Sequence, residues 1–216
     1  MGTSLVSYTD WLWRELSLLQ ERLRWFELAL TYIDDAAPPS VEARIHIALG
    51  YDLQGRNRGR LSHDLRAIDL LRQFDGEPAL LGYALMEAGK ATSRHRDVAE
   101  AEQYSDEALA ILRRHGRTKW LAAALQSAGS IRRDAGDLRT AQALTEEALA
   151  LSKQLGDVRV LGAWEAQLAL NAFAARRMNR AMALAIGGQR VEEIERTVEH
   201  AKGIESAHGP HSEAVG

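Results

Sequence analysis

The chain has 216 residues and a net charge of −3, with 46% hydrophobic residues, 26% charged residues and no cysteine. This composition is ordinary for a soluble globular protein, and the charge excludes a general attraction to DNA or to anionic membranes. The absence of cysteine excludes disulfides, thiolate catalysis and cysteine-ligated metals, and it fits the cytoplasm, where we expect the protein to reside. No apolar run reaches the roughly 18 residues of a membrane span, and the N-terminus lacks a secretory signal pattern.

Residues 5–34 are the first predicted element, an opening helical segment that Pro38 and Pro39 end. Its aromatic residues recur at helical spacing, which leaves two roles open for them. They cap the core of the elements that follow, which is the favoured role, or they form part of a self-association face that would make a homodimer. The aromatic residues concerned are Trp11, Trp13, Trp25 and Phe26.

From about residue 40 the sequence repeats with a period of 40 residues. The segments DEALAILRRHG (106–116) and EEALALSKQLG (146–156) align without gaps, and RAIDLLRQFDG (66–76) follows the same register. Within each period, apolar residues recur in steps of three and four, which places them on one face of an amphipathic helix. We expect helix pairs at about 40–75, 78–115, 118–155 and 158–202, followed by a flexible tail at 203–216.

Glycine and aspartate mark the predicted helix ends. Gly116 and Gly156, with Gly76 one period earlier, stand where a helix ends. A left-handed residue after a helix is sterically easy only for glycine. Asp97 and Asp137 stand where the second helix of a pair begins, and a carboxylate there can accept a hydrogen bond from an unpaired backbone N–H.

This pattern resembles the tetratricopeptide-repeat (TPR) family. The resemblance implies an all-α fold, a right-handed α-solenoid of stacked antiparallel helix pairs that forms one domain over residues 5–202. The period of 40 residues, longer than the family's usual 34 or so, looks like the repeat arrays in the C-terminal portions of large bacterial signal-transduction ATPases and winged-helix transcriptional regulators. The residues that carry the resemblance are Leu85, Ala88, Gly89, Ala101 and Ala108 in one repeat, and Leu125, Ala128, Gly129, Gly136, Ala141 and Ala148 in the next.

The resemblance also implies where a partner binds, on a concave face lined by the first helix of each pair. A mixed lining with Met, Tyr and Phe suits a peptide or a helix better than a highly charged ligand. The other interpretation is that Met86 and Phe173 pack against neighbouring helices. The implied groove residues are His46, Tyr83, Met86, Lys90, Ser93, Arg94, Gln126, Ser130, Arg133, Leu170 and Phe173.

The stretch GRNRGR (55–60) raises the question of an anion site. Asn57 aligns with Asp97 and Asp137 and is predicted to cap a helix N-terminus, so the turn explains the glycines. The arginines of this turn and of equivalent turns would form a discontinuous basic edge, although a solvated turn is the favoured interpretation. The residues of this edge are Arg56, Arg58, Arg60, Arg94, Arg96, Arg176, Arg177 and Arg180.

No catalytic pattern is present in the sequence. The segment GYALMEAGKAT (82–92) differs from a phosphate loop because Ala84 and Ala91 stand where glycine and Ser or Thr are needed. The seven histidines are scattered, so we expect no metal and no cofactor. We predict a non-enzymatic scaffold that binds a protein or peptide and neither nucleic acid nor a membrane. The alternative is an effector-sensing regulatory module that binds an anionic ligand at the basic turns.

Overall fold

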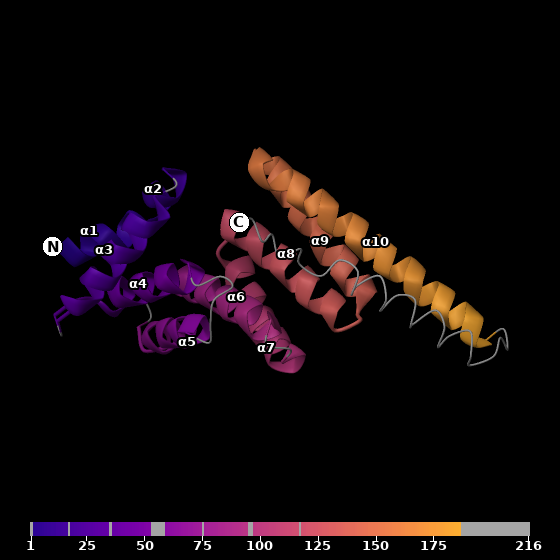
Figure 1. Cartoon of the computed structure of the whole chain (residues 1–216), viewed down its shortest axis with the longest axis horizontal. Helices are drawn as coiled ribbons and strands as arrows, with labels where there is room; N and C mark the ends of the chain where they lie inside the picture. The colour runs from indigo at the N-terminus through magenta and orange to yellow at the C-terminus, as the bar shows by residue number, and fades with distance from the viewer. Residues whose placement is uncertain are drawn as a thin grey trace, which may run out of the picture. The chain divides into compact units, whose positions relative to one another are not determined.

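The computed structural model describes residues 2–16, 18–34, 36–52, 59–74, 76–94, 97–116 and 118–186 (Figure 1). Within these ranges all regular secondary structure is α-helical, which confirms the all-α prediction. Among the described helices, none is long and apolar enough to cross a membrane. The chain divides into two compact units, Met1–Ala169 and Leu170–Gly216.

The opening segment contains three helices, α1 (Gly2–Tyr8), α2 (Asp10–Glu15) and α3 (Leu19–Thr31). Helices α1 and α3 pack on α4 (Pro39–Asp52), and α2 packs on α3. Helix α4 begins at a proline because the first helical turn needs no N–H from that residue. Phe26 is buried with Val41 and Ile45 of α4, and Trp13 packs against the same cluster. The capping role is therefore confirmed for Phe26 and Trp13, whereas Trp25 is exposed and the side chain of Trp11 lies outside the described residues.

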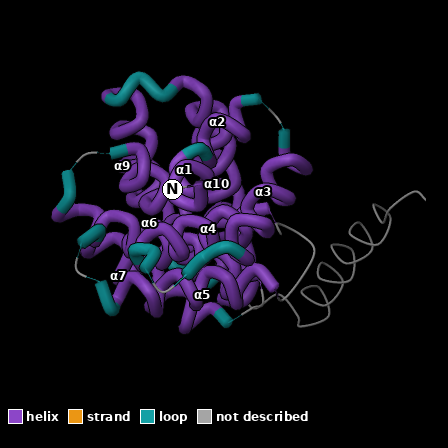
Figure 2. The backbone as a smooth tube through the Cα atoms, turned by 90° about the vertical axis from the view of Figure 1, so that its left-hand side faces the viewer, coloured by secondary structure: helices purple, strands orange, loops and turns teal. Residues whose placement is uncertain are grey.

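Three helix pairs follow within a few residues of their predicted bounds. They are α4 with α5 (Gly59–Arg72), α6 (Pro78–Arg94) with α7 (Val98–Arg114), and α8 (Lys119–Asp134) with α9 (Leu138–Gln154). A short turn, residues 135–137, joins α8 to α9, and Figure 2 shows the described turns between helices in teal. The first helices contact one another in order, α4 to α6 to α8, while α5 contacts α6 and α7 contacts α8. The first helices thus form one layer and the second helices another.

The core of this unit follows the 40-residue register. Leu85 and Leu125 are fully buried one period apart, and Ala108 and Ala148 repeat the pattern on the second helices. Trp164, in the first part of α10 (Val158–Ile186), is buried in the same cluster. The sequence periodicity therefore predicted the burial of these leucines and alanines correctly, whereas Trp164 was not predicted.

Two of the three predicted terminal glycines are left-handed. Gly116 has φ +89° and Gly156 has φ +67°. After α9, the N–H of Gly156 donates to the carbonyl of Lys153 at 3.2 Å and the N–H of Asp157 donates to that of Ser152 at 3.0 Å, a Schellman motif. Gly76 differs, because its φ is not in the left-handed region and the ring of Phe74 occupies the space where a Cβ would stand.

The predicted aspartate caps are confirmed. Asp97 Oδ1 accepts a hydrogen bond from the N–H of Glu100 at 3.1 Å, and α7 begins directly after it. Asp137 Oδ1 accepts one from the N–H of Thr140 at 3.1 Å, directly before α9. Their predicted equivalent, Asn57, lies outside the described residues.

The turn predicted inside the fourth helix pair, 158–202, is absent from the part of that range that the structure describes. Helix α10 runs for 29 residues, Val158–Ile186, straight through Arg176 and Arg177. One period earlier these positions hold Gly136 and Asp137, the glycine that ends α8 and the aspartate that caps α9. With arginines in their place, no local signal stops the helix. Residues 187–202 and the predicted tail lie outside the described residues, and a single domain over 5–202 stays a prediction.

The close packing of α8 on α9 leads to a test at Gly129. A Cβ at this glycine would stand 2.6 Å from Thr145 Oγ1 and 3.0 Å from the carbonyl oxygen of Ala141. Thr145 Oγ1 already donates to that carbonyl at 2.8 Å, so it cannot turn aside without losing this hydrogen bond. We expect Gly129→Ala to lower the free energy of unfolding by about 1–3 kcal/mol, measured by urea denaturation.

Gly162 supplies the matched control for that substitution. It lies on the exposed side of α10, and apart from its chain neighbours and the backbone of its own helix no atom stands within 4 Å of a Cβ built there. Gly162→Ala is expected to raise the free energy of unfolding by up to about 1 kcal/mol, because alanine is the better helix former. Equal effects of the two substitutions would refute the close approach at Gly129.

Candidate functional site

The unit Met1–Ala169 carries a cleft of about 230 Å³ on the layer of first helices, hereafter the inner-face cleft. Helices α4, α6 and α8 contribute to it, and α1 and α2 close it from the N-terminal side. The cleft therefore depends on the stacking of all three helix pairs. Its lining residues are Ser7, Tyr8, Asp10, Arg44, Ile47, Ala48, Leu80, Tyr83 and Trp120.

A stacked aromatic pair forms one wall of the inner-face cleft. The rings of Tyr83 on α6 and Trp120 on α8 have centroids 5.2 Å apart and planes at 26°. Both side chains are half-buried, so each packs against its helix and still borders the cleft. Such a pair contributes about 0.5–1.5 kcal/mol beyond burial and presents a rigid apolar surface.

Arg44 borders the cleft from α4. Its guanidinium pairs with the carboxylate of Glu77 and lies 4.5 Å from the centre of the Tyr8 ring. Its Nε is buried and has no hydrogen-bond partner among the described residues. One and two periods later the same register holds Ala84 and Ala124, which are buried in the core. The ring and the carboxylate therefore hold a charge at a position that elsewhere belongs to the core.

A second ion pair holds the N-terminal helices against α4. Arg22 of α3 is buried, pairs with Asp10 of α2, and donates from Nη2 to the carbonyl of Ala48 at 3.0 Å. Asp10 and Ala48 both line the inner-face cleft. The two charged residues of the cleft lining, Asp10 and Arg44, are thus each paired with an opposite charge.

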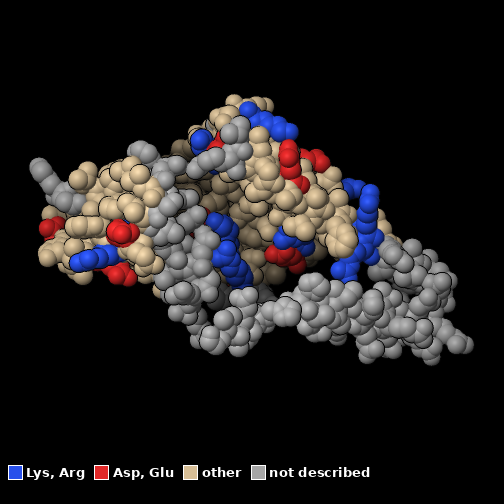
Figure 3. All heavy atoms as spheres, turned by 45° about the horizontal axis from the view of Figure 1, so that its top comes forward, with Lys and Arg blue, Asp and Glu red and all other residues tan. Residues whose placement is uncertain are grey.

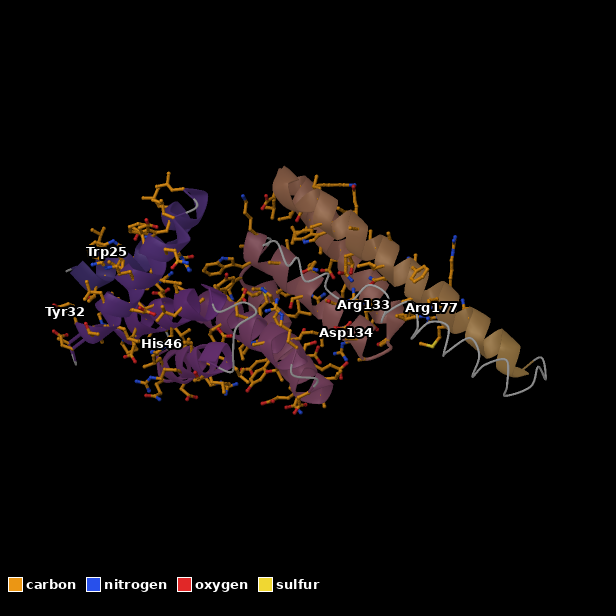
Figure 4. The ribbon with its side chains drawn as sticks, in the orientation of Figure 1. Trp25, Tyr32, His46, Arg133, Asp134 and Arg177 are labelled. Atoms are coloured by element: carbon orange, nitrogen blue, oxygen red, sulfur yellow. The ribbon has the colours of Figure 1, made fainter. Side chains whose placement is uncertain are left out.

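The structure separates three residues that were predicted for the same groove. Tyr83 lines the inner-face cleft. Met86 is buried in the core between the helix pairs, so its packing interpretation is the right one. His46 points toward α5 instead of the inner layer (Figure 4), because its Nδ1 lies 2.7 Å from Nδ1 of His63.

The predicted polar groove residues on α6 and α8 are held by near neighbours. Lys90 donates to Oε1 of the buried Glu87 at 2.8 Å. Arg133 donates from Nη2 to Ser130 Oγ at 3.0 Å and to Asp134 Oδ1 at 2.9 Å, and Figure 4 shows this arginine beside Asp134. These contacts lie along the helices, outside the cleft lining. The other predicted groove positions of this unit are the half-buried Ser93 and Gln126 and the exposed Arg94.

The remaining predicted groove residues belong to the unit Leu170–Gly216. Leu170 is 55% exposed and Phe173 is 59% exposed on α10. The guanidinium of Arg177 lies 5.8 Å from the centre of the Phe173 ring, one helical turn away. Phe173 is therefore exposed. The interpretation that it packs against neighbouring helices is wrong.

The predicted basic edge is tested at few positions. Arg94 is exposed at the end of α6, whereas Arg176 and Arg177 lie within α10 and not in a turn. In Figure 3 the lysines and arginines form several separate groups, with acidic side chains near some of them. An anion site at the basic turns stays a prediction. Arg56, Arg58 and Arg96, together with the side chains of Arg60 and Arg180, lie outside the described residues.

The two histidines between α4 and α5 share one hydrogen bond. At an Nδ1–Nδ1 distance of 2.7 Å, one ring donates a hydrogen bond from Nδ1–H and the other accepts it on Nδ1. The two neutral rings therefore hold opposite tautomers. Glu42 Oε1 lies 3.7 Å from His46 Nε2 and also accepts from Arg66 at 2.9 Å. No group of three His, Asp or Glu side chains that could hold a metal ion occurs in the described part of the chain.

Comparison with known proteins gives structural but no sequence matches. No protein-family profile and no curated protein matches the sequence at a significant level. The crystal structure of BtubC (BKLC) from P. vanneervenii superposes with a TM-score of 0.64 at 17% identity, over 98% of this chain and 84% of that chain. A putative kinesin light chain from P. anserina, with nearly identical TPR-like repeats, gives 0.57 at 14% identity, over 98% and 99%.

A third solved structure is the Rap conjugation gene regulator of the plasmid pLS20 in complex with the Phr* peptide. It gives a TM-score of 0.55 at 13% identity, over 92% of this chain and 62% of that chain. The chain has a TPR-like fold. At these identities the likeness concerns the fold, which agrees with the stacked helix pairs described above.

Of the residues that line the inner-face cleft, Tyr83 alone was among the predicted groove residues, and two of those that were missed, Trp120 and Arg44, depart from the TPR-like register. Trp120 stands one helical turn before Ala123, the period equivalent of Tyr83, and its own period equivalent is Leu80. Arg44 stands where later repeats have buried alanines. An aromatic residue in the first turn of α8 and a charge at a core position were the signals that could have identified them.

The histidine pair of the TPR-like stack leads to a prediction of pH dependence. Burial, followed by the neighbouring His63, lowers the pKa of His46 from 6.5 to about 4, against the opposing effect of Glu42. Burial also lowers the pKa of His63, against the charge of Glu27. Between these pH values the unfolded chain therefore binds protons that the folded chain does not. The free energy of unfolding is highest above pH 6.5 and decreases as the pH falls toward about 4.

Between about pH 7.5 and pH 5, we expect the free energy of unfolding to fall by roughly 2 kcal/mol more in the wild-type protein than in the His46→Gln variant. Urea denaturation at the two pH values measures this difference. The exposed His115, at the end of α7, provides the control, because His115→Gln should leave the pH dependence of the wild type unchanged. Parallel pH profiles for wild type and His46→Gln would show that the pair does not govern acid stability.

Proposed function

We propose that this chain is a non-enzymatic scaffold whose inner-face cleft receives one apolar or aromatic side chain of a partner peptide or protein. The observation that carries the proposal is the stacked pair Tyr83–Trp120, which borders a cleft built from three successive helix pairs. Rigid aromatic side chains that border a depression are the usual anchors of protein interfaces.

The size of the cleft favours a side chain over a whole small molecule. Its volume of about 230 Å³ lies below the roughly 300–1,000 Å³ of typical ligand pockets. The charges at its border are paired, Arg44 with Glu77 and Arg22 with Asp10, so neither sign of ligand charge is strongly favoured.

The comparisons supply fold-level support for peptide binding. The Rap regulator, which shares the TPR-like fold, is described in complex with the Phr* peptide. We extend the proposal to a cytoplasmic setting and to a role as the partner-binding region of a bacterial regulator, the setting that the 40-residue period favours.

A selection experiment tests the proposal without knowledge of the natural partner. Phage-displayed random peptides are selected on the wild-type protein and counter-selected on the Tyr83→Ala, Trp120→Ala double variant. We expect the selected peptides to share one aromatic or large aliphatic residue, and Trp120→Ala to weaken their binding by about 30-fold or more, measured by isothermal titration calorimetry.

Trp25→Ala is the matched control, because it removes the same side chain from α3, outside the inner-face cleft. It should leave peptide affinity unchanged. Thermal denaturation of each variant separates lost binding from lost folding. Peptides that bind wild type and Trp120→Ala equally well would refute the assignment of the cleft.

A further inference from the structure

The N-terminal end of the helix stack carries a second and larger cleft, hereafter the α3 cleft. Its volume is about 640 Å³, and its walls come from α1, α3 and the segment that precedes α4. Trp25, Leu28 and Tyr32 line it, and Figure 4 shows Trp25 and Tyr32 at this end. Their side chains are 47%, 42% and 71% exposed. Neither the core nor the proposed peptide site accounts for this apolar surface.

The exposed apolar residues of α3 and its C-cap Tyr32 have the spacing of a helix-packing face. Trp25, Leu28 and Tyr32 follow one another in steps of three and four residues, whereas the buried Phe26 and Ala29 face α4. Helix α3 is thus apolar on two sides, although it packs on α4 through one of them. A second apolar stripe on a helix of a water-exposed surface marks an interaction site.

Helix α10 presents a complementary stripe in the unit Leu170–Gly216. Leu170, Phe173 and Met178 are 55%, 59% and 44% exposed. Arg176 and Arg177 are exposed beside them, and the guanidinium of Arg177 lies over the Phe173 ring. Hereafter these three apolar residues with Arg177 are the α10 stripe.

The charges at the two surfaces are opposite. Among the described residues that line the α3 cleft, Asp34 is the one charged side chain, and it is exposed. The α10 stripe carries arginine. A pair of apolar surfaces with opposite charges at their borders is steered into contact and fixed in register by those charges.

We propose that the α10 stripe of one copy of this chain docks into the α3 cleft of a second copy. The contact uses different surfaces on the two copies, so each added copy leaves one cleft and one stripe unoccupied at the ends of the assembly. Such a head-to-tail contact forms open chains, or a ring where the rotation closes.

Sedimentation velocity over roughly 5 to 500 µM protein tests the proposal, because self-association follows mass action. The average mass of the wild type should rise with concentration, to roughly twofold the monomer mass or more at the upper end. Leu28→Asp in the cleft and Phe173→Asp in the stripe should each remain monomeric. Both side chains are exposed, so both variants should fold, which circular dichroism checks.

An equimolar mixture of the two variants gives the decisive result. Leu28→Asp retains its stripe and Phe173→Asp retains its cleft, so the mixture should form a one-to-one dimer that grows no further. A cleft-to-cleft contact would leave Phe173→Asp self-associating, and a stripe-to-stripe contact would leave Leu28→Asp self-associating. Either result overturns the proposal, as does a wild type that stays monomeric at the highest concentration.

Charge reversal provides a second measurement that needs no change of apolar residues. Asp34→Arg and Arg177→Asp should each weaken association, and a mixture of the two variants should restore it, because the reversed charges again attract one another. Ala143→Asp, which adds a carboxylate to the exposed side of α9, should associate like the wild type. Reversed variants that associate like the wild type would overturn the proposed register.

Discussion

The close approach of the two helices within a pair is the constraint on which the rest of the structure depends. A Cβ at Gly89 would stand 3.3 Å from the carbonyl oxygen of Ala101, and one period later a Cβ at Gly129 would stand 3.0 Å from that of Ala141. Glycine on one helix and alanine on the other let the two backbones approach this closely. Because the α6–α7 and α8–α9 pairs close in the same way, α6 and α8 meet in one layer, which α4 continues, and the inner-face cleft forms there.

Residues that interrupt the repeat carry the features that distinguish this chain from a uniform stack. Arg44 replaces a core alanine and is held between Tyr8 and Glu77, which ties α1 and the start of α6 to α4. At the other end of the repeats, arginines replace the glycine that ends α8 and the aspartate that caps α9, and α10 continues to Ile186. The regular positions thus build the fold, whereas the exceptions create its surfaces.

The sequence predicted the helix pairs because helical periodicity, Asp97, Asp137 and the left-handed glycines are local signals that act within one turn. It did not predict the cleft, because the stacking of Tyr83 on Trp120 depends on how two helix pairs are rotated against each other. His46 shows the same limit. Its position in the repeat predicted that it lines the groove, but its side chain is hydrogen-bonded to His63 on the paired helix. This contact can be predicted only when the geometry of the helix pair is known.

The two clefts differ in ways that would let them act together. The inner-face cleft is small and its charged residues are in ion pairs. The α3 cleft is larger, and Asp34 gives its border a negative charge. They use different faces of the N-terminal helices, so occupation of one does not fill the other. Head-to-tail association would then repeat the peptide site at every copy, and a partner with several anchor residues would bind an assembly more tightly than a monomer through effective concentration alone. Self-association would in this way set the avidity of the scaffold without any new contact to its partner.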